Sequence, residues 1–189
     1  MSEIRADKIH NVTGDNDSGI DLSTNDQVII KTADTTAVSV DASGRVTMPL
    51  QPYFQARSSA GNFTNEWDAG QVIKFQTVDT NQGSHYSSST GRFTAPVAGF
   101  YQFNFTGFGY NGGAVGTTNV IVFLRKNGTN YIALVYDHNN VNGTTYPSAT
   151  GSAAVYLSVN DYVDLYVSSA GIYADTSNLY TAFSGFLVA

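Results

Sequence analysis

The chain has 189 residues, a length that suits one or two domains. Hydrophobic residues make up 42% of it and charged residues 13%, with a formal net charge of −6. This composition excludes a disordered polyelectrolyte and a basic nucleic-acid-binding surface. No apolar run is long enough to span a bilayer, and the absence of cysteine excludes disulfides and thiol chemistry.

The first part of the chain, residues 1–52, differs sharply from the rest. It contains no aromatic residue, whereas all 12 Tyr, all 11 Phe and the one Trp follow from residue 53 onward. Pro49 and Pro52 mark the change, and proline stiffens the backbone around it. We therefore predict two parts, an N-terminal segment over 1–52 and a domain over 53–189.

Within residues 1–52, short aliphatic pairs alternate with polar residues between turn-forming Asn, Asp and Gly. Alternation over a few residues predicts short strands, but their small apolar side chains are too few to bury a core. Two interpretations remain: a disordered leader, or short strands that fold against copies of themselves, another domain or a partner surface. In the second case the residues expected to anchor the segment are Ile4, Ile9, Ile20, Leu22, Val28 and Ile30.

Residues 53–189 contain a series of alternating segments separated by glycine-rich turns. Expected strands cover 71–78, 100–108, 120–126, 131–136, 153–159, 162–168 and 180–188. Asn127-Gly128 after the third of these is a strong hairpin signal. No helical periodicity is present, so the pattern predicts an all-β sandwich, jelly roll or barrel.

Several segments of this domain resemble the globular head domain of complement C1q, the jelly roll shared with the tumour necrosis factor family. The most specific is residues 90–103 (TGRFTAPVAGFYQF). Similar segments are 54–56 (FQA), 70–75 (GQVIKF), 124–128 (LRKNG), 151–157 (GSAAVYL), 161–163 (DYV) and 183–187 (FSGFL). The resemblance covers residues 53–189 in order.

This resemblance implies an antiparallel jelly-roll sandwich that forms a homotrimer. The aromatic residues expected in its core or trimer interface are Phe75, Phe103, Phe105, Phe183 and Phe186. Relatives in animals usually carry a collagen stalk before this domain, but residues 1–52 lack a Gly-X-Y repeat. They are instead similar to N-terminal segments of bacteriophage virion proteins, on the residues 1–6 (MSEIRA) and 38–49 (VSVDASGRVTMP).

The two resemblances together indicate a structural protein on the virion surface. One role is capsid decoration, in which residues 1–52 hold the major capsid protein. The alternative is a short tail or head fibre that contacts tail or fibre proteins and binds a host receptor or glycan. A secreted C1q-like binding module is a further alternative, disfavoured because no signal peptide precedes the domain. Neither nucleic acid nor membrane insertion is expected.

The sequence offers little for catalysis. No Gly-x-Ser-x-Gly nucleophile elbow is present, and the three histidines are isolated, so we expect no enzyme. No cofactor is expected either; Asp175 is the one weak candidate for calcium, where some family members bind it.

Loops rich in Tyr and Asn suit recognition of a receptor or sugar. The candidate receptor residues are Tyr110, Asn111, His138, Asn139 and Asn140.

Overall fold

A computed structural model describes residues 6–10, 18–24, 26–58, 65–110, 118–139, 147–173 and 180–189. Within these ranges the secondary structure consists of strands and turns, without helix. Consequently, the described residues contain no helix that could span a membrane. The chain divides into two compact units, Met1–Gln51 and Pro52–Ala189, which we call the N-terminal unit and the head.

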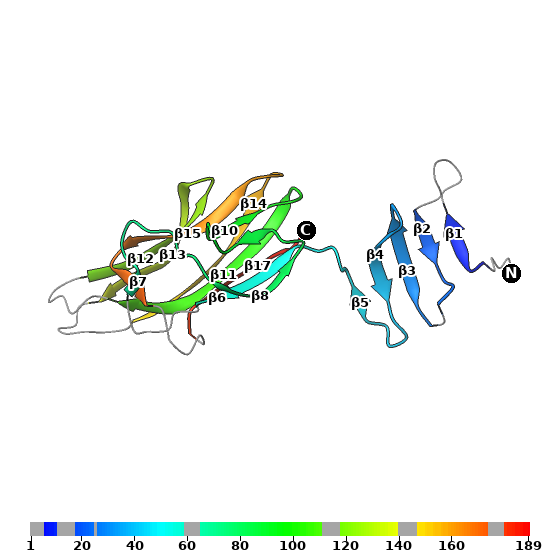
Figure 1. Cartoon of the computed structure of the whole chain (residues 1–189), viewed down its shortest axis with the longest axis horizontal. Coiled ribbons are helices and arrows are strands. Elements are labelled where there is room, and N and C mark those ends of the chain that lie inside the picture. The colour runs from blue at the N-terminus through cyan, green and yellow to red at the C-terminus, as the bar shows by residue number, and fades with distance from the viewer. Residues whose placement is uncertain are drawn as a thin grey trace. The chain divides into compact units, whose positions relative to one another are not determined.

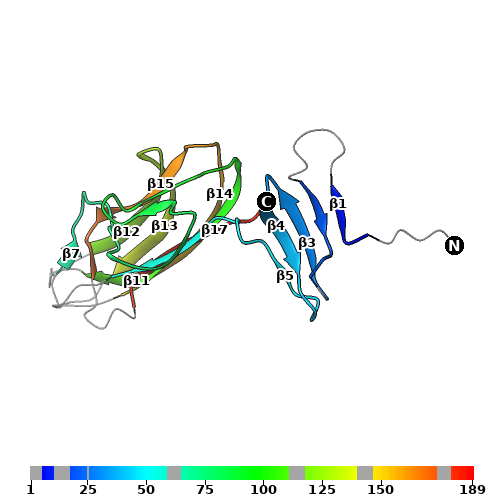
Figure 2. The same ribbon diagram turned by 45° about the vertical axis from the view of Figure 1, so that its right-hand side comes forward.

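The N-terminal unit is a single antiparallel sheet whose five strands follow chain order. Figures 1 and 2 show these strands side by side in one layer. The strands are β1 (Lys8–His10), β2 (Gly19–Asp21), β3 (Val28–Thr32), β4 (Thr35–Val40) and β5 (Val46–Thr47). Of the two interpretations of this segment, the structure therefore has the short strands. The last turn is fixed by Asp41, whose Oδ1 accepts hydrogen bonds from the backbone N–H groups of Ser43 (2.9 Å) and Arg45 (3.0 Å).

The head is a sandwich of two antiparallel sheets (Figure 1). In one sheet the order is β13 (Thr129–Asn139), β12 (Thr118–Lys126), β15 (Tyr162–Ser169), β10 (Arg92–Thr94) and β9 (Tyr86–Ser87). In the other it is β7 (Asn65–Trp67), β16 (Gly171–Tyr173), β11 (Gly99–Tyr110), β17 (Ala182–Leu187), β6 (Tyr53–Arg57) and β8 (Thr77–Gln82). β14 (Ser148–Leu157) also pairs with β11. The predicted all-β jelly-roll sandwich is confirmed.

The core lies between the two sheets and is rich in aromatic rings. Phe54 stacks on Tyr86 with ring centroids 4.7 Å apart and on Phe93 at 5.2 Å. The edge of Phe183 meets Phe54 at 5.0 Å, which joins β17 to the same cluster. Offset and edge-on pairs at these distances add to the stabilisation from burial. The cluster thus ties strands of both sheets together.

The five aromatic residues expected in the core or interface separate into two groups. Phe75, Phe103, Phe105 and Phe183 are buried in the core. Phe186 is not, and 43% of it is exposed. Successive side chains of a strand point to opposite faces, so Phe183 of β17 points inward whereas Phe186 points outward.

One predicted strand is misplaced. The alternation over 71–78 predicted a single strand, but the strand in this region is Thr77–Gln82. Residues 71–73 instead run beside β15, where Ile73 N donates to Leu165 O (2.9 Å) and Val167 N donates to Gln71 O (2.9 Å). Ile73 is fully buried there. The alternation therefore arises because one side of this extended segment is buried. Such burial does not require the continuous hydrogen bonding of a β-strand.

The predicted Asn127-Gly128 hairpin joins β12 to β13. Both residues have positive φ, 51° and 80°, as a two-residue hairpin turn requires. The Asn127 side chain donates to Asp161 Oδ1 (2.7 Å) and accepts from the N–H of Tyr162 (2.9 Å). Hydrogen bonds from Asn127, Ser158 and Lys126 lower the pKa of Asp161 to about 2. The turn is thereby fastened to the start of β15.

Gly185 lies where β17 passes between two core rings. A Cβ at this position would lie 2.5 Å from Cδ1 of Phe103 and 2.8 Å from Cε1 of Phe54. We expect Gly185→Val to lower the free energy of unfolding by about 1–3 kcal/mol or more, because the rings must move apart. Thermal or denaturant unfolding would measure this.

The matched control is Ser184→Ala on the neighbouring, outward-facing position of the same strand, with an expected change within about 0.5 kcal/mol. An unchanged melting temperature for Gly185→Val would show that β17 is not packed against the two rings as described.

Candidate interaction surfaces

Four aromatic residues gather on the outer face of the head's larger sheet. Phe100 of β11 lies opposite Tyr156 of β14, with ring centroids 5.4 Å apart, and Phe186 of β17 lies opposite Tyr53 of β6. All four are substantially exposed. We call this set, Tyr53, Phe100, Tyr156 and Phe186, the aromatic patch. Exposed apolar groups that cluster on a sheet face are typical of a protein interface.

Farther along the same strands this face becomes polar. Gln55, Asn104 and Ser184 line a hollow of about 240 Å³ in this part of the sheet. The Gln102 side-chain amide donates to the carbonyl of Phe103 (3.2 Å) and to Asn104 Oδ1 (3.3 Å). Polar side chains whose hydrogen bonds are already made are typical of the polar rim that surrounds the apolar centre of an interface. The aromatic patch and this polar stretch together resemble the centre and rim of a subunit interface.

The opposite sheet carries a buried carboxylate between two guanidinium groups. Asp164 of β15 is fully buried and accepts from Arg125 Nε (2.6 Å) and Nη2 (3.0 Å) on the neighbouring strand β12. Arg92 of β10 lies 3.5 Å away on the other side. The hydrogen bonds that Arg125 donates to the Asp164 carboxylate raise the pKa of Arg125.

Tyrosine rings cover both guanidinium groups of this cluster. The Arg92 guanidinium lies 4.1 Å from the ring centroid of Tyr162, and that of Arg125 lies 4.5 Å from the ring of Tyr166. Cation–π contacts of this kind hold an arginine in one conformation. The carboxylate is fully satisfied by its neighbours, so the cluster fastens β10, β12 and β15 together and offers no free acid or base for catalysis.

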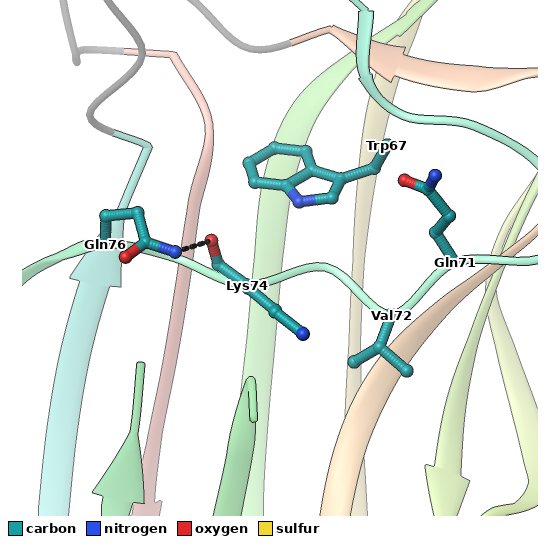
Figure 3. A pocket seen from close by; sticks show the side chains of 5 residues that line it. All are labelled: Trp67, Gln71, Val72, Lys74 and Gln76. Carbon is teal, nitrogen blue, oxygen red and sulfur yellow. Dashed lines mark hydrogen bonds between the residues drawn. The ribbon is translucent and has the colours of Figure 1, made fainter. Parts of the chain in front are cut away.

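A second hollow of about 480 Å³ lies beside Trp67 (Figure 3). Its lining residues are Trp67, Gln71, Val72, Lys74 and Gln76. The Gln71 side-chain carbonyl accepts from the N–H of Asp68 (3.3 Å), and the Gln76 amide donates to the carbonyl of Lys74 (3.3 Å). Both amides therefore have partners within the chain. Among the described residues of the lining, Lys74 carries the one charge, so these residues do not include a pair of titratable groups.

Of the five predicted receptor residues, the structure describes three by their backbone and none by its side chain. Tyr110 ends β11 and His138 and Asn139 end β13, but only their backbone positions are described. Asn111 and Asn140 lie outside the described residues. Recognition of a receptor or glycan by these loops therefore stays a prediction.

Within the described ranges, no group of three or more His, Asp or Glu side chains could hold a metal ion. The calcium candidate Asp175 lies outside those ranges.

The residues predicted to anchor the N-terminal unit are exposed. Ile9, Ile20, Leu22, Val28 and Ile30 are each 38–45% exposed, although they are aliphatic. Ile4 lies outside the described residues. The unit thus presents apolar side chains to its surroundings instead of enclosing them.

Neither the Asp164 cluster nor the aromatic patch as a whole was predicted from the sequence, although Phe186 was among the residues expected in the core or trimer interface. Asp164 had a local signal, because it is a charged residue between Val163 and Leu165 in an otherwise apolar strand. The aromatic patch had no such local signal in the sequence. Its members come from four strands, and only the register of the sheet brings them together.

With this geometry established, comparison with known proteins identifies the family. The family model described as "C1q domain" matches residues 54–188, so the chain belongs to the C1q domain family. Domains of this family and of the related tumour necrosis factor family are typically homotrimeric and non-enzymatic.

A curated relative supports the same family. The collagen alpha-1(X) chain of Mus musculus is 33% identical over 123 residues, which cover 64% of this chain. The match spans only 17% of that collagen chain.

Solved structures share the fold of the head. The globular domain of zebrafish complement 1qA has a TM-score of 0.54 at 16% identity, covering 74% of this chain and 98% of that chain. The tumour necrosis factor Eiger from S. frugiperda has a TM-score of 0.54 at 8% identity, covering 74% and 93%. Murine APRIL has a TM-score of 0.50 at 13% identity, covering 73% and 99%.

The Asp164 cluster leads to a stability prediction. We expect Asp164→Asn to lower the free energy of unfolding by about 2–4 kcal/mol, because the change leaves the largely buried Arg125 without its carboxylate. Chemical denaturation would measure it. The control is Asp79→Asn, which removes the more exposed Asp79–Arg57 pair and should cost about 0–1 kcal/mol. Equal effects of the two changes would contradict a fastening role for Asp164.

Proposed function

We propose that the chain is a non-enzymatic structural protein of a bacteriophage particle, namely a homotrimeric capsid decoration protein. In this role the N-terminal unit attaches the trimer to the shell by binding the major capsid protein. The C1q head faces solvent on the virion surface. The role needs neither a cofactor nor nucleic acid.

The observation that carries the proposal is the single-layer sheet of the N-terminal unit. A sheet with one apolar face is stable when that face is covered by another layer. This unit has one layer and leaves its aliphatic side chains exposed. Such a unit is built for assembly with other chains, which a component of a particle requires.

A trimeric head is supported by the family and by the aromatic patch. The family is typically homotrimeric. The patch provides an apolar surface of the kind found at the centre of subunit interfaces, where aromatic residues are enriched. On a threefold axis, every copy presents the same patch to a neighbour.

The trimer interface can be tested at Phe186. Phe186→Asp places a carboxylate in the aromatic patch, where burial without a partner is unfavourable. We expect the concentration at which half of the chains are monomeric to rise at least tenfold, as measured by sedimentation velocity of the full chain. The control Thr90→Asp adds the same charge in an exposed turn of the other sheet and should leave the association unchanged.

Two outcomes would oppose this part of the proposal. A wild-type chain that is monomeric at micromolar concentration would remove the trimer. A Phe186→Asp chain that associates as tightly as the wild type would place the interface elsewhere on the head.

The particle role is tested by copy number. We expect quantitative mass spectrometry of purified particles to find this chain in an abundance comparable to that of the major shell protein, because a decoration protein repeats over the capsid lattice. A small multiple of three copies per particle would instead indicate a short fibre, whose weak contacts with a host surface are multiplied by avidity. Absence from particles would overturn the phage role altogether.

A further inference from the structure

One face of the N-terminal sheet is lined by aliphatic side chains in two continuous rows. Strand pairing places Ile9, Ile20, Ile30 and Val38 directly opposite one another across β1 to β4. It places Val28, Val40 and Val46 in a second row across β3 to β5. Residues two apart on a strand share a face, so both rows lie on the same side. We call these seven residues the aliphatic face.

The opposite face is different because its charges already have partners. Asp21 lies within 3.5 Å of the Lys8 ammonium group and 3.3 Å of the Lys31 ammonium group. Hydrogen bonds from the Ser23 hydroxyl and backbone N–H, together with the two lysines, hold the pKa of Asp21 well below its usual range. This face is suited to water, so the unit needs a covering layer on its aliphatic face alone.

The composition of the aliphatic face defines what can cover it. Its two rows carry no charged and no aromatic side chain, and a partner must therefore be apolar and about as wide as five short strands. The same face of another copy has this composition and width. Because the rows carry no charge, copies meet there without repulsion between like charges.

We propose that the aliphatic face is covered by the same face of two other copies, so that three N-terminal sheets enclose one axial apolar core. The proposal rests on the trimer of the proposed function. Three sheets around a threefold axis each contact both neighbours, and the assembly closes without leaving a fourth apolar face exposed. Ile and Val fill such a core well because they are compact and have few rotamers.

A short connector favours other copies over the shell as the occupant. Only residues 48–52 separate β5 from β6, the first strand of the head. Five extended residues span at most about 18 Å, so a trimer of heads keeps three N-terminal units near one another. Tethering of this kind produces an effective concentration in the millimolar range, at which apolar faces associate readily.

In such a trimer the predicted anchoring residues have a different role. Ile9, Ile20, Val28 and Ile30 then hold the three copies together and do not touch the shell. Contact with the major capsid protein falls to the outside of the three-sided unit, where Lys8, Asp21 and Lys31 lie. Attachment to the particle should accordingly weaken with salt more than trimer formation does.

Two neighbouring isoleucines provide a matched test in a chain that has no cysteine of its own. Ile30 lies on the aliphatic face of the central strand β3, and Ile29 lies on the opposite face, beside Asp21 and Ser39. In one isolated sheet Ile30 is exposed, whereas Ile29 is half-buried. Ile30→Cys should therefore react with a thiol reagent at least as fast as Ile29→Cys if nothing covers the aliphatic face.

The proposed core reverses that order. In the full-length trimer, we expect dithionitrobenzoate to modify Ile30→Cys at least a hundredfold more slowly than Ile29→Cys, because a thiol in the core is out of reach of the reagent. Diluting the protein until sedimentation shows monomer should abolish the protection. Val28→Cys, on the aliphatic face of the same strand, should behave as Ile30→Cys does.

Each other outcome overturns the inference in a distinguishable way. A trimer in which Ile30→Cys reacts as fast as Ile29→Cys would refute the axial core but keep the trimeric head, and protection gained only on particles would make the shell the occupant. Protection that persists in the monomer would show that another part of the same chain covers the face. A chain that never trimerises would refute the proposed function as well.

Discussion

The head depends on the missing side chain at Gly185. Phe54 and Phe103 approach this position so closely that even a Cβ would overlap them. Because β17 has no side chain there, these rings join the cluster of Tyr86, Phe93 and Phe183 that links the two sheets. Sandwich cores are close-packed, so the space left by one residue decides whether the sheets can close.

The same strand connects the core of the head with its candidate interface. Phe183 faces inward and belongs to the core, whereas Phe186 faces outward and belongs to the aromatic patch. Because side chains alternate along β17, the packing of its inner residues in the core fixes the position of the strand. The position of the strand in turn fixes where the Phe186 ring lies on the outer face. On the other sheet, the Asp164 cluster uses outward positions to fasten neighbouring strands instead.

The two units differ in how they bury their apolar side chains. The head has two sheets and encloses an aromatic core between them. The N-terminal unit has one sheet and leaves its aliphatic residues exposed, so its burial depends on other chains. In the proposed trimer, head association brings the N-terminal sheets together, and the sheets in turn add apolar contacts that strengthen the trimer.

Local pattern in the sequence was sufficient for the all-β class, the Asn127-Gly128 hairpin and the resemblance to the C1q family. These features depend on residues close together in the chain: alternation, turn residues with positive φ, and a contiguous segment such as 90–103. Pairing between distant segments decided the rest. Residues 71–76 alternate like a strand, but only 71–73 pair with β15 and the strand itself begins at Thr77. Phe100 and Phe186 enter the aromatic patch through registers with Tyr156 and Tyr53. Alternation shows that a residue faces one side of a sheet, but only the tertiary register determines which residues share that side.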